Sequence, residues 1–130
     1  MFKDPLVIAG KEYKSRLLVG TGKYINEEQA LESIKASKSE IVTVAIRRVE
    51  LDSKKRPNSI LNLVTPEQFT ILPNTAGCFS AKEAIRIACL GRELLNGESL
   101  VKLEVLKDKE TLLPLMLSLI HISEPTRRTS

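Results

Sequence analysis

The chain has 130 residues, of which 42% are hydrophobic and 28% are charged, a balance typical of one folded domain. Its net charge is +4, from 20 basic and 16 acidic residues, and the basic residues are spread along the chain. No aromatic residues alternate with the densest basic run, at 53–56, which disfavours a nucleic-acid partner. Only 4% of the residues are aromatic, so aliphatic side chains must build the core. Such a composition suits helices packed on β-branched strands.

The cysteines and the N-terminus indicate the cellular compartment in which the protein is found. Cys78 and Cys89 form no CxxC pair, and we expect neither a metal nor a cofactor. Two reduced, partly buried thiols favour a reducing space. The chain has no run of about 18 apolar residues, and its N-terminus lacks the apolar stretch of a signal peptide. We therefore expect a cytoplasmic protein, or one of the plastid stroma, with no membrane partner.

Strands are predicted from short apolar runs. A hairpin at residues 6–13 precedes them, because apolar stretches flank a turn that contains Gly10. The strands themselves are expected at residues 16–20, 41–46, 69–72 and 100–106, with Pro73 ending the third of them.

Helices are predicted between these strands. Two capping boxes, Asn26 with Gln29 and Ser80 with Glu83, begin helices that end near residues 37 and 95. A helical turn is expected at residues 59–64, after a polar loop at 50–58. Ala30 and Ile34 would form the apolar stripe of the first helix.

The alternation of strands and helices predicts an α/β fold with a parallel sheet. Four strands fit the N-terminal half of a (β/α)8 barrel, truncated after about the fourth strand, because a whole barrel needs about 250 residues. A small doubly wound sheet is the competing architecture. The pair Gly20 and Gly22 does not indicate dinucleotide binding, because Ile25 stands where the third glycine of that motif would be.

The fourth predicted strand carries the candidate chemistry. Since a strand has period two, Lys102 and Glu104 share one face, while Val101, Leu103 and Val105 share the other. In a helix-covered barrel the polar face points inward, where partial desolvation would favour a neutral, nucleophilic amine. Glu104 would then move protons beside it. The alternative is an exposed strand whose polar face merely lies in water.

Five segments resemble the thiazole synthase family of the thiamin pathway. In chain order they are SRLLVGTGK (15–23), EIVTVAIRRV (40–49), LPNTAGC (72–78), LVKLEV (100–105) and TLLP (111–114). Their order and spacing match the N-terminal half of the family, and the similarity spans residues 4–114. The family has the (β/α)8 barrel fold, so the resemblance favours the barrel over the doubly wound sheet.

The resemblance implies an activity and its residues. Family members condense 1-deoxy-D-xylulose 5-phosphate with dehydroglycine and with sulfur from a carrier-protein thiocarboxylate. Lys102 would form the imine with the sugar ketone, Glu104 would assist proton transfer, and Asn74 and Thr75 are weaker candidates for substrate contact. The whole enzyme is expected to be a homo-oligomer. Arg47 and Arg48 would lie at the active-site mouth or at a subunit contact.

The end of the chain departs from the family. Residues 1–116 are expected to form the N-terminal part of the barrel, which would be inactive without the phosphate-holding loops of the second half. Residues 117–127 (LSLIHISEPTR) resemble a translated sequencing-library adapter, so we expect residues 117–130 to be non-native and to pack against nothing specific. The only histidine, His121, lies there and is assigned no role.

Two other functions compete with this hypothesis. The first is another Schiff-base barrel acting on a sugar phosphate, such as an aldolase, although the NTAGC and VKLEV segments together argue against it. The second is a small, non-catalytic interaction domain.

Overall fold

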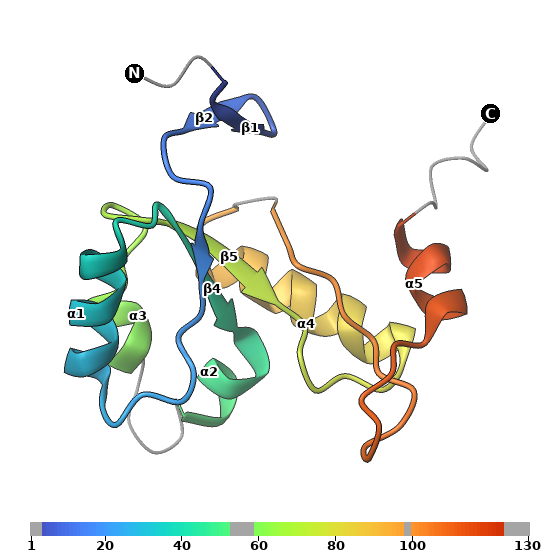
Figure 1. The fold of residues 1–130 in the computed structure, drawn as a ribbon. Coiled ribbons are helices and arrows are strands. Elements are labelled where there is room, and N and C mark those ends of the chain that lie inside the picture. The colour runs from blue at the N-terminus through green and yellow to red at the C-terminus, as the bar shows by residue number, and fades with distance from the viewer. Residues whose placement is uncertain (1–3, 53–58, 98–99, 124–130) are drawn as a thin grey trace.

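A computed structural model describes residues 4–52, 59–97 and 100–123 (Figure 1). The elements follow in the order β1 (Leu6–Ile8), β2 (Lys11–Tyr13), β3 (Leu18–Val19), α1 (Glu27–Ser37), β4 (Ile41–Ala45), α2 (Ile46–Asp52), α3 (Ser59–Leu63), β5 (Thr70–Asn74), α4 (Ala81–Leu94) and α5 (Met116–Ser123). The predicted α/β class is therefore confirmed.

The strands form a hairpin and a parallel sheet. β1 and β2 pair antiparallel, as predicted, and the buried ring of Tyr13 brings its hydroxyl to 3.3 Å from the Thr70 hydroxyl at the start of β5. The sheet has the order β3-β4-β5, with both pairs parallel. The hairpin therefore lies against the amino end of the sheet, which leaves the carboxyl ends of the strands free for a site.

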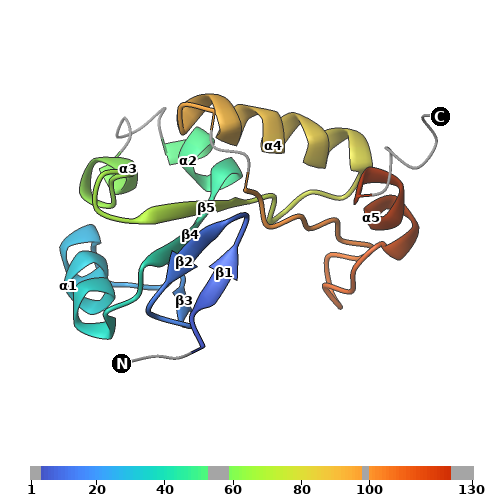
Figure 2. The same ribbon diagram turned by 90° about the horizontal axis from the view of Figure 1, so that it is seen from above.

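Helices cover one face of this sheet, and Figure 2 shows the other face open among the described elements. Side chains alternate accordingly along the strands: Val42 and Val44 of β4 and Ile71 of β5 are buried with Ile34 of α1. A second cluster packs Val105 against Ile87 and the rest of the buried face of α4. The residues between them, such as Thr43 and Leu72, are only half-buried, because they project toward the open side.

The capping signals act as predicted. The Asn26 side chain accepts from the Gln29 N–H at 2.8 Å, and Gln29 accepts in return from the Ile25 N–H at 3.0 Å. The Ser80 hydroxyl accepts from the Glu83 N–H at 3.2 Å and begins α4. Side chains thereby satisfy N–H groups that the first turn of a helix leaves without partners.

Two predictions around β4 and β5 are wrong. Residues 50–52 belong to α2, which continues β4 directly, whereas a loop was expected; residues 53–58 of that predicted loop lie outside the described residues. β5 also continues through Pro73. The Thr70 N–H donates to the Glu40 carbonyl, on the side of β4. Successive residues of a strand direct their N–H groups to alternate sides, so an N–H at position 73 would point away from β4. The N–H that proline lacks is therefore not needed for pairing with β4.

The same proline explains why the fourth strand is incomplete. Residues 100–106 run beside β5, but they meet it in a single parallel bridge between Asn74 and Lys102. The Lys102 N–H donates to the Pro73 carbonyl at 2.8 Å, and Lys102 accepts from the Thr75 N–H at 3.2 Å. Because Pro73 has no N–H to donate to the segment at 100–106, the ladder between this segment and β5 lacks one hydrogen bond. The segment therefore does not form a regular strand.

The predicted lack of packing after residue 116 is wrong for the described part of that segment. Residues 116–123 form α5, which lies against α4, and Leu119 packs on the cluster that contains Ile87 and Val105. An apolar stretch next to an incompletely covered helix buries part of its surface there. Among the described residues no helix is both long and apolar enough to cross a membrane.

Gly91 of α4 lies close to Ile46 of α2 and to Pro73 of β5. A Cβ atom at this position would lie 2.9 Å from Ile46 Cγ1 and 3.2 Å from Pro73 Cβ. We predict that Gly91→Ala lowers the free energy of unfolding by about 1–2 kcal/mol, since overpacking outweighs the gain in helix propensity. Urea denaturation at fixed protein concentration measures it. The exposed Cys89→Ala in the same helix should change stability by less than about 0.5 kcal/mol, and equal midpoints for both variants would contradict the prediction.

Candidate functional site

The candidate site lies on the open face, near the carboxyl ends of the strands. Ala45 pairs in register with Asn74, and Asn74 bridges to Lys102, so these three residues form one row across the sheet. Laterally paired residues project to the same face of a sheet. Neither Ala45 nor Asn74 belongs to the buried clusters under the helices, which places the row on the open side.

Lys102 and Glu104 share this face, as the sequence predicts. Val105 is buried in the cluster under α4 and Leu103 packs partly buried against it, so the residues that alternate with them point the other way. Glu104 is half-buried and Lys102 is exposed. The expected partial desolvation of Lys102 is thus absent, because no described element covers the open face.

Asn74 and Thr75 differ in what they can contact. The Asn74 side-chain oxygen accepts from the Ala76 N–H at 3.0 Å and fixes the turn that follows β5. Thr75 is fully buried, and its hydroxyl bonds to the main chain of Glu104. Sequence reasoning missed this contact, since a threonine after a strand gives no signal that distinguishes a substrate ligand from a bond to the neighbouring segment.

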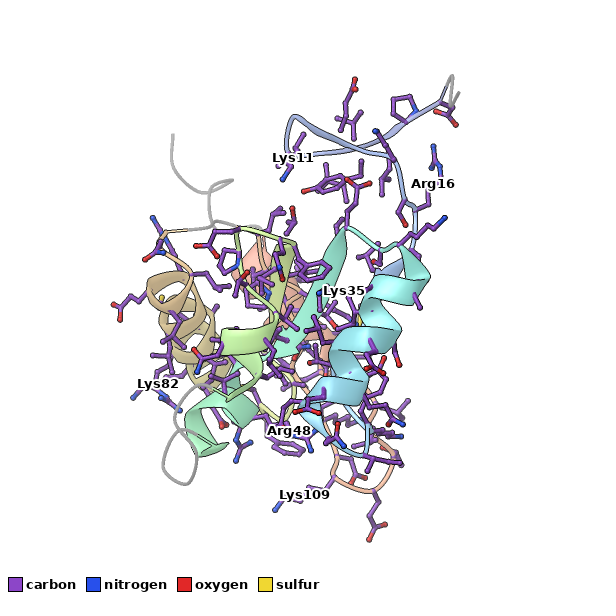
Figure 3. The ribbon with its side chains drawn as sticks, turned by 90° about the vertical axis from the view of Figure 1, so that its left-hand side faces the viewer. Lys11, Arg16, Lys35, Arg48, Lys82 and Lys109 are labelled. Atoms are coloured by element: carbon purple, nitrogen blue, oxygen red, sulfur yellow. The ribbon has the colours of Figure 1, made fainter. Side chains whose placement is uncertain are left out.

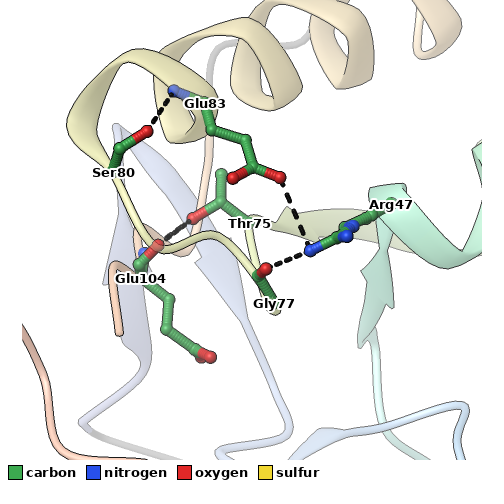
Figure 4. A network of polar contacts seen from close by, with 6 residues as sticks. All are labelled: Arg47, Thr75, Gly77, Ser80, Glu83 and Glu104. Carbon is green, nitrogen blue, oxygen red and sulfur yellow. Dashed lines mark hydrogen bonds and ion pairs between the residues drawn. The ribbon is translucent and has the colours of Figure 1, made fainter. Parts of the chain in front are cut away.

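Arg47 ties the loop after β5 to two helices (Figure 4). Its guanidinium donates to the Gly77 carbonyl and lies 3.5 Å from a Glu83 carboxylate oxygen of α4. Gly77 adopts a φ of +86°, and a Cβ there would lie 3.2 Å from Arg47 Nη1. A glycine is therefore required both by the backbone conformation and by the close approach of the arginine.

Cys78 follows this loop and is buried. Burial raises the pKa of the Cys78 thiol, and the neighbouring Glu83 carboxylate adds to the rise. The thiol is therefore neutral at neutral pH and is a weak nucleophile. Among the described residues, no group of three or more potential metal ligands from His, Cys, Asp and Glu comes together.

A cavity of about 210 Å³ opens at the ends of β3 and β4, lined by residues of α1, α2 and α3 and by Val44 and Ala45 of β4. Its polar groups are partly engaged: the Thr21 hydroxyl donates to the Thr43 carbonyl at 3.1 Å, and Asn26 caps α1. Arg48 lines this cavity, whereas the neighbouring Arg47 bonds to the loop after β5, so the two arginines have different surroundings.

The basic residues labelled in Figure 3 come from several separate elements. Figure 3 shows labelled cations on the hairpin, on α1, on α2, on α4 and on the loop before α5. Those labelled are Lys11, Arg16, Lys35, Arg48, Lys82 and Lys109.

The fold and the site define an α/β protein that presents a lysine and a glutamate on the open face of a helix-backed parallel sheet. Residues 7–126 match the family model described as "Thiazole biosynthesis protein ThiG". The chain is 52% identical over 120 residues to a thiazole synthase of Pseudomonas savastanoi pv. phaseolicola, covering 92% of the chain and 46% of that relative. It is 56% identical over 121 residues to one of Methylobacillus flagellatus, covering 93% of the chain and 47% of the relative.

The chain belongs to the thiazole synthase (ThiG) family. The predicted resemblance to this family is therefore confirmed. The chain spans less than half the length of these curated relatives.

Proposed function

We propose that the protein is a thiazole synthase to which this chain contributes the Schiff-base lysine. Lys102 attacks the ketone of 1-deoxy-D-xylulose 5-phosphate, and the imine forms with loss of water. Glu104 shuttles protons during the condensation with dehydroglycine and with sulfur from a carrier-protein thiocarboxylate. The whole protein acts as a homo-oligomer in the cytoplasm or a plastid stroma.

One observation carries the assignment of residues. Lys102 is the lysine that bridges in register to Asn74 of β5, and Glu104 follows it on the same open face. A substrate on that face would meet an amine, a carboxylate and the Asn74 amide near the carboxyl ends of parallel strands, where α/β enzymes place their chemistry. We propose that Asn74, and not the buried Thr75, contacts the substrate.

The parallel sheet is best explained as part of a (β/α)8 barrel. Its three strands and the segment at 100–106 would form the first half, and a second half would cover the open face. Covering that face would also remove water from around Lys102, and a desolvated amine is a better nucleophile. Lys102 would then gain its reactivity only in the closed barrel.

A fusion protein tests this function. Residues 1–116 are joined to the part of the Methylobacillus flagellatus relative that follows the equivalent position. Thiazole phosphate should form, detected by mass spectrometry, only when the sugar phosphate, dehydroglycine and the carrier thiocarboxylate are all present. Cleavage of the sugar phosphate without the carrier would indicate an aldolase instead, and neither product nor imine would indicate an interaction domain.

We also propose a boundary at residue 116, with residues 1–116 as the native barrel segment and 117–130 as adapter-derived sequence. The proposal is supported by the resemblance of residues 117–127 to a translated adapter. Sequencing the same gene from a library made without adapters of that type is expected to give different codons after residue 116. Recovery of the same tail would show that it is native.

A further inference from the structure

The side chain of Thr75 joins β5 to the segment that carries Lys102. Its hydroxyl accepts from the Glu104 N–H at 2.7 Å and donates to the Glu104 carbonyl at 2.7 Å. The residue is fully buried, so no solvent competes for these bonds. Figure 4 shows the Glu104 carboxylate extending away from Thr75, so only the main chain of Glu104 is held and its side chain stays available.

These bonds replace a missing part of the parallel ladder. After the bridge between Asn74 and Lys102, the Glu104 N–H would next donate to the Thr75 carbonyl in a regular ladder. The hydroxyl of the same residue accepts that bond instead, because the main chain turns away from the ladder toward Gly77. On the amino side, Pro73 has already removed a donor. The other main-chain bonds from this segment to β5 and its loop are the pair at Lys102 and the bond from the Leu106 N–H to the Cys78 carbonyl at 2.8 Å, so among the described residues the Thr75 hydroxyl makes the only hydrogen-bonding contact between these two points.

The loop that carries Thr75 is itself held in place. Arg47 bonds to the Gly77 carbonyl and approaches Glu83, whose N–H is capped by Ser80. Thr75 therefore stands between a loop anchored on α2 and α4 and a segment that is not a regular strand. A shift of that segment by one residue would turn Lys102 and Glu104 under the helices and Leu103 outward.

We propose that Thr75 is a positioning residue: its buried hydroxyl fixes the register of Lys102 and Glu104, so that both face the substrate side. The inference rests on the proposed function, which assigns the chemistry of Lys102 and Glu104. The register of these two residues can be measured in this chain without that function. Thr75 does not touch the substrate and acts only through the main chain of Glu104.

The first test reads the register without any activity. In the 130-residue chain, hydrogen exchange of the Glu104 amide is compared for Thr75→Val, which keeps the shape, and Thr75→Ser, which keeps the hydroxyl. Exchange should be about tenfold faster in the valine variant and near the original rate in the serine variant. The matched control is Ser39→Ala, which loses a buried hydroxyl that bonds to the Ile41 carbonyl at 2.9 Å, at the amino end of the sheet.

The second test uses the fusion protein. Thr75→Val should lower kcat by about 10- to 100-fold with KM changed less than about twofold, since the misplaced amine affects chemistry more than binding. Thr75→Ser should restore kcat, and Ser39→Ala should leave it unchanged.

Three outcomes would overturn the proposal: unchanged Glu104 exchange in Thr75→Val, an unchanged kcat despite faster exchange, or a serine variant as impaired as the valine variant. If Thr75→Val does not fold, the serine variant still decides, because any loss there contradicts a role of the hydroxyl alone. An inactive unmodified fusion would count against the thiazole synthase function, while the exchange data would still decide the register.

Discussion

Thiazole phosphate formation by the fusion protein is expected to fall at least about 10³-fold when Lys102 is replaced by alanine, a loss of roughly 4 kcal/mol of transition-state stabilisation. The reason is that the covalent route disappears, since alanine offers no amine to the ketone. Lys102→Arg should be equally inactive, because a guanidinium keeps the charge but does not form an imine under these conditions. Loss of activity in both variants would show that the Lys102 amine acts as a nucleophile and not only through its positive charge.

Borohydride trapping gives the direct measurement. Reduction of the imine should attach the sugar phosphate to one peptide, which contains Lys102, and the label should be absent from both variants. Lys107→Ala is the matched control: it removes an exposed lysine further along the same segment and should leave labelling and turnover unchanged. Undiminished label in Lys102→Ala would assign the imine to another lysine.

Local signals in the sequence predicted α1 and α4 well. Asn26 and Ser80 cap α1 and α4 as expected, because a capping box depends only on residues three positions apart. The face shared by Lys102 and Glu104 also followed from period two alone, and the burial of Val105 and the partial burial of Leu103 on the other face agree with it, whereas Val101, expected beside them, is exposed. Both kinds of prediction require only the local chain geometry.

Other features depend on contacts between distant residues, which no local pattern contains. Pro73 lies inside β5 because its missing donor points away from β4, and the orientation of that strand follows only from its pairing. The bond of Thr75 to Glu104 spans 29 residues, so the sequence offered no reason to separate Thr75 from Asn74. The exposure of Lys102 likewise depends on what covers the open face, which these residues do not specify.

A polypeptide limited to these 130 residues is expected to self-associate and to show no turnover. Within the described part of the sheet, β3 pairs only with β4. The segment at 100–106 meets β5 and the loop that follows it, and only at its end, at Val105 and Leu106, does it also pair with the chain around Pro114. The outer sides of both therefore present main-chain N–H and C=O groups that a closed barrel would pair. Leu18 of β3 and Val101 beside Lys102 are also exposed, at 42% and 39%, so apolar surface accompanies the open edges.

Dimerisation through these edges would reduce the exposed surface, and aggregation is the competing outcome. Neither supplies the phosphate-holding loops that barrels place after their last strands, so binding of the sugar phosphate should be lost even where Lys102 still reacts. Sedimentation velocity should therefore show species larger than a monomer, and calorimetric titration with the sugar phosphate should show no saturable heat. The fusion protein is the control, since its closed sheet should restore binding. A monodisperse monomer that unfolds cooperatively and binds the sugar phosphate would mean that the open face is stable by itself and that the second half is not needed to hold the substrate.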